Sequence, residues 1–119
     1  MTHPSVETLD PQEVKDLLDR GELLLVDVRE PAEFAVERIH GALLYPLSTF
    51  DASMLPHDWT RRVVFYCGSG KRSLAAAEKR LAAGNDMAAH MGGGITAWKR
   101  AALPVISLSP VTGAVVDRR

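Results

Sequence analysis

Hydrophobic and polar residues follow one another along the chain in blocks that predict strands alternating with helices. The segment 10–13, Asp-Pro-Gln-Glu, combines a capping box with proline at the first helical position. It predicts a helix that ends at Gly21. The apolar run over 23–28, broken only by Asp27, is typical of a buried strand in a parallel sheet.

A second clear strand is predicted over 63–66, and a long alanine-rich helix follows over 73–83 and ends at Gly84. This helix is expected to bury residues spaced three and four apart: Leu74, Ala77 and Leu81.

Several shorter elements complete the pattern. They are a helix opening at Pro31, a strand over 42–45, a short helix and loop over 48–60, a strand over 88–91, a turn over 92–94, and a last helix with Ile95, Trp98 and Ala102 on one face. Residues 105–106 are expected to pair at a sheet edge, and residues 111–119 to be loose. Strands that alternate with helices predict an α/β domain whose central, mostly parallel sheet is flanked by helices.

Length and composition narrow the class of protein. The 119 residues fit one domain, taken as 1–119, and 46% hydrophobic with 24% charged residues argues against disorder. No apolar run approaches the roughly 20 residues of a membrane span, and no secretory signal is visible at the start. The net charge of −1, with both signs interspersed, argues against nucleic-acid binding.

Cys67 is the only cysteine, so an internal disulfide and a cysteine-rich zinc site are excluded. A single thiol fits a reducing compartment, and we expect a cytoplasmic protein. The four histidines have no metal-ligand spacing, so no metal and no cofactor are predicted.

The most informative segment is the turn that follows the strand 63–66. Cys67 ends that strand, two glycines allow a tight curl, and a helix begins directly afterwards. Backbone N–H groups can then point at the sulfur, and the basic side chains add positive charge. A buried structural cysteine would not need such neighbours, so we predict a low-pKa nucleophile. The residues expected to surround a substrate are Gly68, Ser69, Gly70, Lys71, Arg72 and Ser73.

This turn resembles the active-site loop of the rhodanese-like sulfurtransferases. Five segments of roughly 8–106 are similar to the family in order and spacing: 25–31 (LVDVREP), 39–42 (IHGA), 67–73 (CGSGKRS), 93–98 (GGITAW) and 103–105 (LPV). The resemblance implies a three-layer sandwich, with 107–119 as a C-terminal tail. It also implies a thiosulfate sulfurtransferase, with a small anionic sulfur donor and with cyanide, a thiol or a protein as the acceptor.

Some positions depart from the family pattern. Arg38 stands where the family often has histidine, and Gly68 stands where many thiosulfate-type members have a basic residue. The start Cys-Gly-Ser-Gly is similar to that of the mercaptopyruvate sulfurtransferases, whose loops continue differently from 71–73. Thiosulfate and mercaptopyruvate therefore both stay open as donors.

The length of the loop separates two chemistries. Cys67 and Arg72 are spaced Cys-x4-Arg, whereas phosphatases with a cysteine–arginine cradle use Cys-x5-Arg. The shorter ring suits the terminal sulfur of a persulfide, which backbone amides would stabilise as in an oxyanion hole. Sulfur transfer by double displacement is favoured. The alternatives are a phosphatase or arsenate reductase, and a sulfur carrier or docking module.

Asp27 and Arg29 lie at the end of the first strand, where sites in α/β proteins are usually built. Two roles are open for them. In the first role, the two side chains brace the floor of the pocket and help to set its charge. In the second role, they form a structural ion pair or a helix cap.

Overall fold

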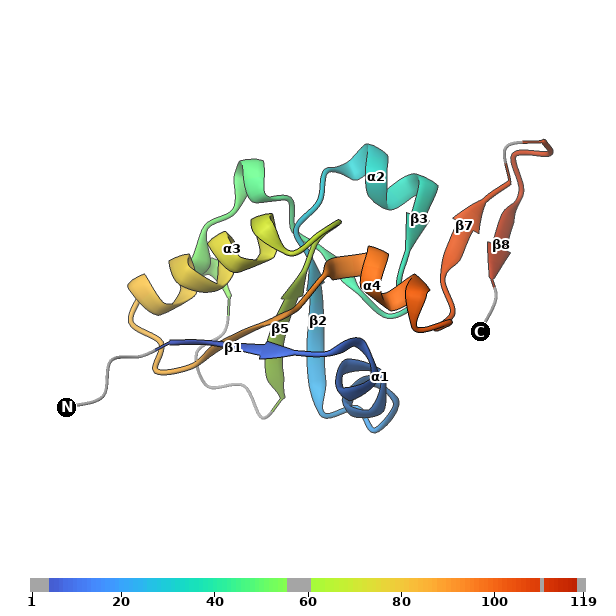
Figure 1. Ribbon diagram of the computed structural model, residues 1–119. Helices are drawn as coiled ribbons and strands as arrows, with labels where there is room; N and C mark the ends of the chain where they lie inside the picture. The colour runs from blue at the N-terminus through green and yellow to red at the C-terminus, as the bar shows by residue number, and fades with distance from the viewer. Residues whose placement is uncertain (1–4, 56–60, 110, 118–119) are drawn as a thin grey trace.

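The structure of the protein, a computed structural model, describes residues 5–55, 61–109 and 111–117 (Figure 1). The helical elements are α1 (Pro11–Asp19), α2 (Pro31–Val36), α3 (Lys71–Ala82), α4 (Gly94–Arg100) and the short 3₁₀ turns η1 (Leu47–Thr49) and η2 (Ala52–Met54). The strands are β1 (Val6–Leu9), β2 (Leu23–Asp27), β3 (Glu37–Arg38), β4 (Leu43–Leu44), β5 (Arg62–Tyr66), β6 (Ala88–Met91), β7 (Ile106–Leu108) and β8 (Val115–Asp117).

A parallel sheet of five strands forms the centre of the molecule, in the order β1-β6-β5-β2-β4. Its register places Asp27, at the end of β2, beside Tyr66 at the end of β5. Because parallel strands end at the same edge, the loops after β2, β5 and β6 meet there. The predicted α/β fold with a mostly parallel central sheet is confirmed.

Helices cover the two faces of this sheet. On one face α1 and α4 pack over a core that contains Leu25, Tyr66 and Trp98. On the other face α3 packs over Phe65 and Cys67. Figure 1 shows β5 and β2 between α3 and α1, so the expected three layers are present.

The beginning of α1 follows directly from the sequence. The carboxylate of Asp10 accepts the N–H of Glu13 at 2.8 Å, and the Glu13 carboxylate accepts the N–H of Asp10 at 3.3 Å. This is the predicted capping box, which satisfies two amides that the first turn leaves unpaired.

A smaller antiparallel sheet of β3, β7 and β8 lies at the C-terminal side of the molecule (Figure 1). Ile106 pairs with Arg38 of β3, which confirms the pairing expected at 105–106. The expectation of a loose tail over 111–119 is wrong for 115–117, which pair with β7. Gly113, at φ +73°, allows the turn that joins the two strands, and β-branched valines favour the second strand.

The predicted buried stripe of α3 is only partly right. The helix begins at Lys71 and buries Ser73, Ala76, Ala77 and Arg80. Leu74 is 39% exposed and Leu81 is half-buried. Small side chains let α3 lie close to β5 and β6, and this contact, rather than the largest apolar residues, decides which face is buried.

Three further details differ from the sequence prediction. Ala102 lies beyond α4 with φ +59° and is exposed, so it does not share the buried face of Ile95 and Trp98. Where a short helix and loop were expected over 48–60, the structure has the two 3₁₀ turns η1 and η2, and 56–60 lies outside the described residues. The strand β1 was not predicted.

Within the described ranges, no helix has the length and apolar character needed to cross a bilayer.

Candidate active site

Strand β5 delivers Cys67 to the edge where the parallel strands end, and α3 begins four residues later. Gly70, in between, adopts φ +109°, which glycine reaches without strain. The N–H groups of Gly70 and Ser73 point at the Cys67 sulfur, with N–Sγ distances of 3.1 and 3.4 Å. The predicted ring of amides is therefore present around Sγ at these two positions.

A second loop holds the cysteine loop in place from outside. The first amides of α4 bind its carbonyls, Ile95 N–H to Cys67 O at 2.9 Å and Thr96 N–H to Gly68 O at 3.2 Å. A Cβ on Gly94 would lie 2.3 Å from the carbonyl oxygen of Cys67, so this contact requires glycine. The triple-glycine turn thus serves to fix the shape of the cysteine loop.

Ser73 adds a side chain to the sulfur site. It is fully buried, and its Oγ lies 3.6 Å from Cys67 Sγ and 2.8 Å from Nδ1 of His90. His90 is on β6 and was not predicted as a site residue. The strand assignment at 88–91 placed it two residues before the glycine turn, but nothing in the sequence indicated that β6 lies beside β5.

Arg72 does not point its charge freely into the site. Its guanidinium forms two hydrogen bonds with the Glu33 carboxylate of α2, at 2.7 and 3.0 Å. The hydrogen bonds from Arg72 lower the pKa of Glu33 to about 2, so the carboxylate stays ionised and balances the arginine. Glu33, in the first turn of α2, was not predicted as a site residue. Lys71 is exposed.

The acidity of Cys67 results from opposing effects. Cys67 is 1% exposed within an apolar cluster, and this burial, the largest single effect, raises the pKa of the thiol. Hydrogen bonds from the Ser73 hydroxyl and from the amides of Ser73, Gly70 and Ser69 lower the pKa and together outweigh burial. The expected lowering of the pKa holds, but the polar surroundings expected from Ser69, Lys71 and Arg72 are wrong, because Cys67 lies in an apolar cluster.

A lowered pKa gives a direct expectation for reactivity. Alkylation of Cys67 by iodoacetamide should have its midpoint below the free-cysteine value of about 8.5, because only the thiolate reacts. The reference is the same chain unfolded in urea, whose only cysteine titrates without the loop. A folded-state midpoint at or above that of the unfolded chain would contradict the acidifying role of the amides.

Asp27 and Arg29 form a buried ion pair with each other. The guanidinium donates to the carboxylate from Nε at 3.1 and 3.2 Å and from the terminal nitrogen at 2.9 Å. The same nitrogen also donates to the carbonyl of Glu37. These contacts fit the structural alternative, and a role of the pair in substrate binding stays a prediction.

The remaining predicted residues lie on the loop itself. Ser69 is exposed and Gly68 is half-buried against the guanidinium of Arg72. In the part of the chain that the structure describes, no three histidine, cysteine or acidic side chains gather into a metal-binding group. The roles assigned to the loop residues in substrate binding stay predictions.

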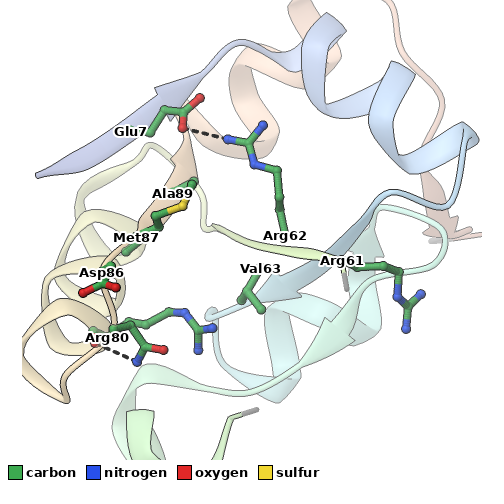
Figure 2. Close-up of a pocket in the computed structure, with 10 residues that line it drawn as sticks. Glu7, Arg61, Arg62, Val63, Arg80, Asp86, Met87 and Ala89 are labelled. Atoms are coloured by element: carbon green, nitrogen blue, oxygen red, sulfur yellow. Dashed lines mark hydrogen bonds and ion pairs between the residues drawn. The ribbon is translucent and has the colours of Figure 1, made fainter. Parts of the chain in front are cut away.

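A separate pocket of about 300 Å³ opens at the opposite edge of the central sheet, near the amino ends of β5 and β6 (Figure 2). Arg62 reaches from β5 to Glu7 of β1 in an ion pair of 2.8 Å, and Arg80 extends into the pocket from α3. Cys67 lies at the other end of β5, so this pocket is not part of the candidate active site.

Comparisons with known proteins identify the family of the chain. The family model of the rhodanese-like domain matches residues 10–101. A protein of Allochromatium vinosum named sulfurtransferase is 38% identical over 91 residues, which cover 76% of this chain and 85% of that protein. MoeZ of Mycobacterium tuberculosis, a probable adenylyltransferase/sulfurtransferase, is 40% identical over 102 residues, which cover 82% of this chain and 26% of that protein.

Solved structures share the fold. A rhodanese-related protein from Thermoplasma volcanium has a TM-score of 0.72 at 25% identity, over 83% of this chain and 96% of that chain. A thiosulfate sulfurtransferase from Pseudomonas aeruginosa has a TM-score of 0.67 at 25% identity, over 87% of this chain and 20% of that chain. The chain spans about half or less of the length of the first curated relatives that it matches. By its sequence and its fold, this chain belongs to the family of rhodanese-like domains.

Proposed function

We propose that this chain is a sulfurtransferase that moves sulfane sulfur from thiosulfate or a similar small anionic donor to cyanide or a thiol, through a persulfide on Cys67. The observation that carries the proposal is the pair of amide hydrogen bonds on Sγ, from Gly70 and Ser73. They favour a thiolate at rest and supply positive dipoles for a negative sulfur. Relatives named as sulfurtransferases support the same class of reaction.

The proposed cycle is a double displacement. The Cys67 thiolate attacks the outer sulfur of thiosulfate, and the sulfur–sulfur bond of the donor breaks with its electron pair leaving on sulfite. The outer sulfur remains on Cys67 as a persulfide. Cyanide or an acceptor thiolate then attacks that sulfur, the persulfide bond breaks, and the electron pair returns to Cys67. Because Cys67 is the only cysteine in the sequence, the acceptor comes from another molecule.

A phosphatase with the same loop is the less favoured alternative. The Cys-x4-Arg ring is one residue shorter than the ring that holds a tetrahedral phosphate. Arg72, which would have to bind phosphate oxygens, is engaged by Glu33 at 2.7 and 3.0 Å. The other alternative is a sulfur carrier or protein-docking module without significant turnover of free substrates. The presence of both Cys67 and Arg72 argues against a degenerate domain of this kind. The single thiol fits a reducing compartment, and we propose a cytoplasmic location.

Intact-mass measurement tests the proposal. Incubation with thiosulfate should add the mass of one sulfur atom to the chain, and cyanide should remove it and form thiocyanate. The same experiment with mercaptopyruvate assigns the donor class. Added sulfur that only a protein thiol removes would indicate the carrier, whereas phosphate release from an aryl phosphate without any added sulfur would indicate the phosphatase.

The exposed charge of Lys71 should help to capture an anionic donor. Lys71→Ala is expected to raise KM for thiosulfate up to about fivefold, the scale of one exposed ion pair, with little change in kcat. The difference should shrink at high salt, because salt screens the attraction.

Lys79→Ala is the matched control for this variant. Lys79 lies in the last turn of the same helix, about 12 Å further along the axis than Lys71. This distance exceeds the Debye length at physiological salt, so the KM of Lys79→Ala for thiosulfate should equal that of the parent chain. Equal KM values for Lys71→Ala and Lys79→Ala at physiological salt would show that Lys71 is only a solvated surface charge.

A further inference from the structure

A chain of hydrogen-bonding side chains runs from the buried sulfur to the surface. Cys67 Sγ lies 3.6 Å from Ser73 Oγ, and Ser73 Oγ lies 2.8 Å from Nδ1 of His90. The other ring nitrogen, Nε2, lies 3.3 Å from Oγ1 of Thr8 on the neighbouring strand β1. Cys67, Ser73 and His90 are buried and Thr8 is exposed.

The hydroxyl of Ser73 is the decisive member because it has a single proton and three polar neighbours. The carbonyl of Gly70, at 3.1 Å, only accepts. The sulfur donates as a thiol and accepts as a thiolate, and Nδ1 donates or accepts according to the tautomer of the ring. If Nδ1 carries the proton, the Ser73 hydroxyl is free to donate to the thiolate. If Nδ1 is bare, the hydroxyl is drawn toward the ring and the sulfur loses a donor.

We propose that His90 is a positioning residue that acts on Cys67 through Ser73. By exchanging its two tautomers, the His90 ring carries protons between the buried thiol and Thr8. This inference rests on the proposed function of Cys67 as a nucleophile. It adds a route by which the buried Cys67 thiol loses its proton and becomes a thiolate. It gives His90, which no motif in the sequence indicates, a role in the reaction.

The proton balance of the relay is simple. In the thiol state the sulfur donates to Ser73 Oγ, Ser73 donates to Nδ1, and Nε2 donates to Thr8. On activation the thiol proton moves to Ser73 Oγ, the Ser73 proton moves to Nδ1, the Nε2 proton moves to Thr8 Oγ1, and the Thr8 proton leaves to water. Among the groups of the protein only the sulfur changes charge, because water takes the released proton, and the reverse steps protonate the sulfur again.

The surroundings of the ring fit a relay that keeps the imidazole neutral. Burial lowers the pKa of His90, which disfavours the imidazolium. The residues that the structure places beside the ring are Thr8 from β1, Ser73 from α3 and Gly70 from the loop. None of these three residues has a side chain that titrates in the ordinary pH range. The titratable group linked to the ring is Cys67, and the link passes through Ser73.

Two amide substitutions separate the two ends of the ring. His90→Asn keeps a hydrogen-bonding nitrogen near the position of Nδ1, beside Ser73, whereas His90→Gln keeps one near the position of Nε2, beside Thr8. Both are polar and smaller than or similar in size to histidine, so both should fold, which thermal unfolding checks. The readout is the pH midpoint of Cys67 alkylation by iodoacetamide, which needs no sulfur donor.

The proposal predicts that His90→Gln raises the pH midpoint of alkylation by about half a unit or more and that Ser73→Ala raises it by about one unit. The midpoint of His90→Asn should lie closer to that of the parent chain than to that of His90→Gln. The double variant Ser73→Ala/His90→Gln should shift no further than Ser73→Ala alone, since His90 acts only through the hydroxyl.

Three outcomes would overturn the role of His90: an unchanged midpoint in His90→Gln, equal midpoints in the asparagine and glutamine variants, or additive shifts in the double variant. The proposed function fails separately, through the absence of added sulfur on the parent chain after incubation with thiosulfate. A shifted midpoint in His90→Gln, together with no added sulfur on the parent chain, would support the role of His90 and contradict the proposed sulfurtransferase function.

Discussion

Cys67→Ser is expected to abolish sulfur transfer while the fold stays intact. Thiocyanate formation from thiosulfate and cyanide should fall by on the order of a thousandfold or more, because a serine hydroxyl forms no persulfide and no second cysteine is present to replace it. The intact mass after incubation with thiosulfate should show no added sulfur.

The fold should survive because serine keeps the contacts of the loop. Its hydroxyl can accept the N–H groups of Gly70 and Ser73, which now bind Sγ at 3.1 and 3.4 Å. The free energy of unfolding should therefore change by about 1 kcal/mol or less, the scale of one neutral hydrogen bond. Thr112→Ser, an exposed change in the turn before β8, is a matched control with parental turnover. Retention of a tenth of the turnover in Cys67→Ser would contradict the role of Cys67.

The central strands could be predicted because they carry their signal locally. A continuous apolar run is enough for β2 and β5, which are covered on both faces. β1 was missed because Val6–Leu9 is four residues long, buries only Leu9 fully and pairs at the edge of the sheet. β8 was missed because none of its three residues is fully buried, so pairing with β7 rather than burial defines it.

The candidate site also contains residues that the local sequence predicted and residues that only tertiary packing brings in. Cys67, Gly70 and Ser73 belong to one turn of chain, so their spacing alone indicated amides around a sulfur. Glu33 and His90 reach the loop from α2 and β6, and only the packing of these elements around β5 brings them there. The expected polar surroundings of Cys67 were wrong for a related reason, because burial under α3 depends on tertiary contacts.

Arg29→Met is expected to cause the largest loss of stability of any substitution considered for this chain. Its partner Asp27 is fully buried, and three guanidinium–carboxylate hydrogen bonds of 2.9–3.2 Å hold the pair together. Removing the cation leaves a buried carboxylate without compensation, which costs about 3–5 kcal/mol. Chemical denaturation should report this loss as a lower midpoint at an unchanged slope.

The double variant Asp27→Asn/Arg29→Met separates the buried charge from the lost packing. The asparagine side chain carries no charge and can still accept the backbone N–H of residue 29, which Asp27 binds at 2.9 Å. Most of the lost stability should therefore return. Arg100→Met, an exposed arginine at the end of α4, should change the free energy of unfolding by no more than about 0.5 kcal/mol.

The same variants decide between the two roles predicted for Asp27 and Arg29. If the pair is structural, the folded fraction of Arg29→Met should acquire persulfide from thiosulfate with the parental KM, measured at a temperature where the variant is folded. The burial of the side chain favours this outcome, because Arg29 is 5% exposed and its Nη2, which binds Asp27, also donates to the carbonyl of Glu37. A raised KM with little loss of stability would instead place the arginine in the donor site, and the charge of Arg29 would then act on the incoming anion rather than on Asp27.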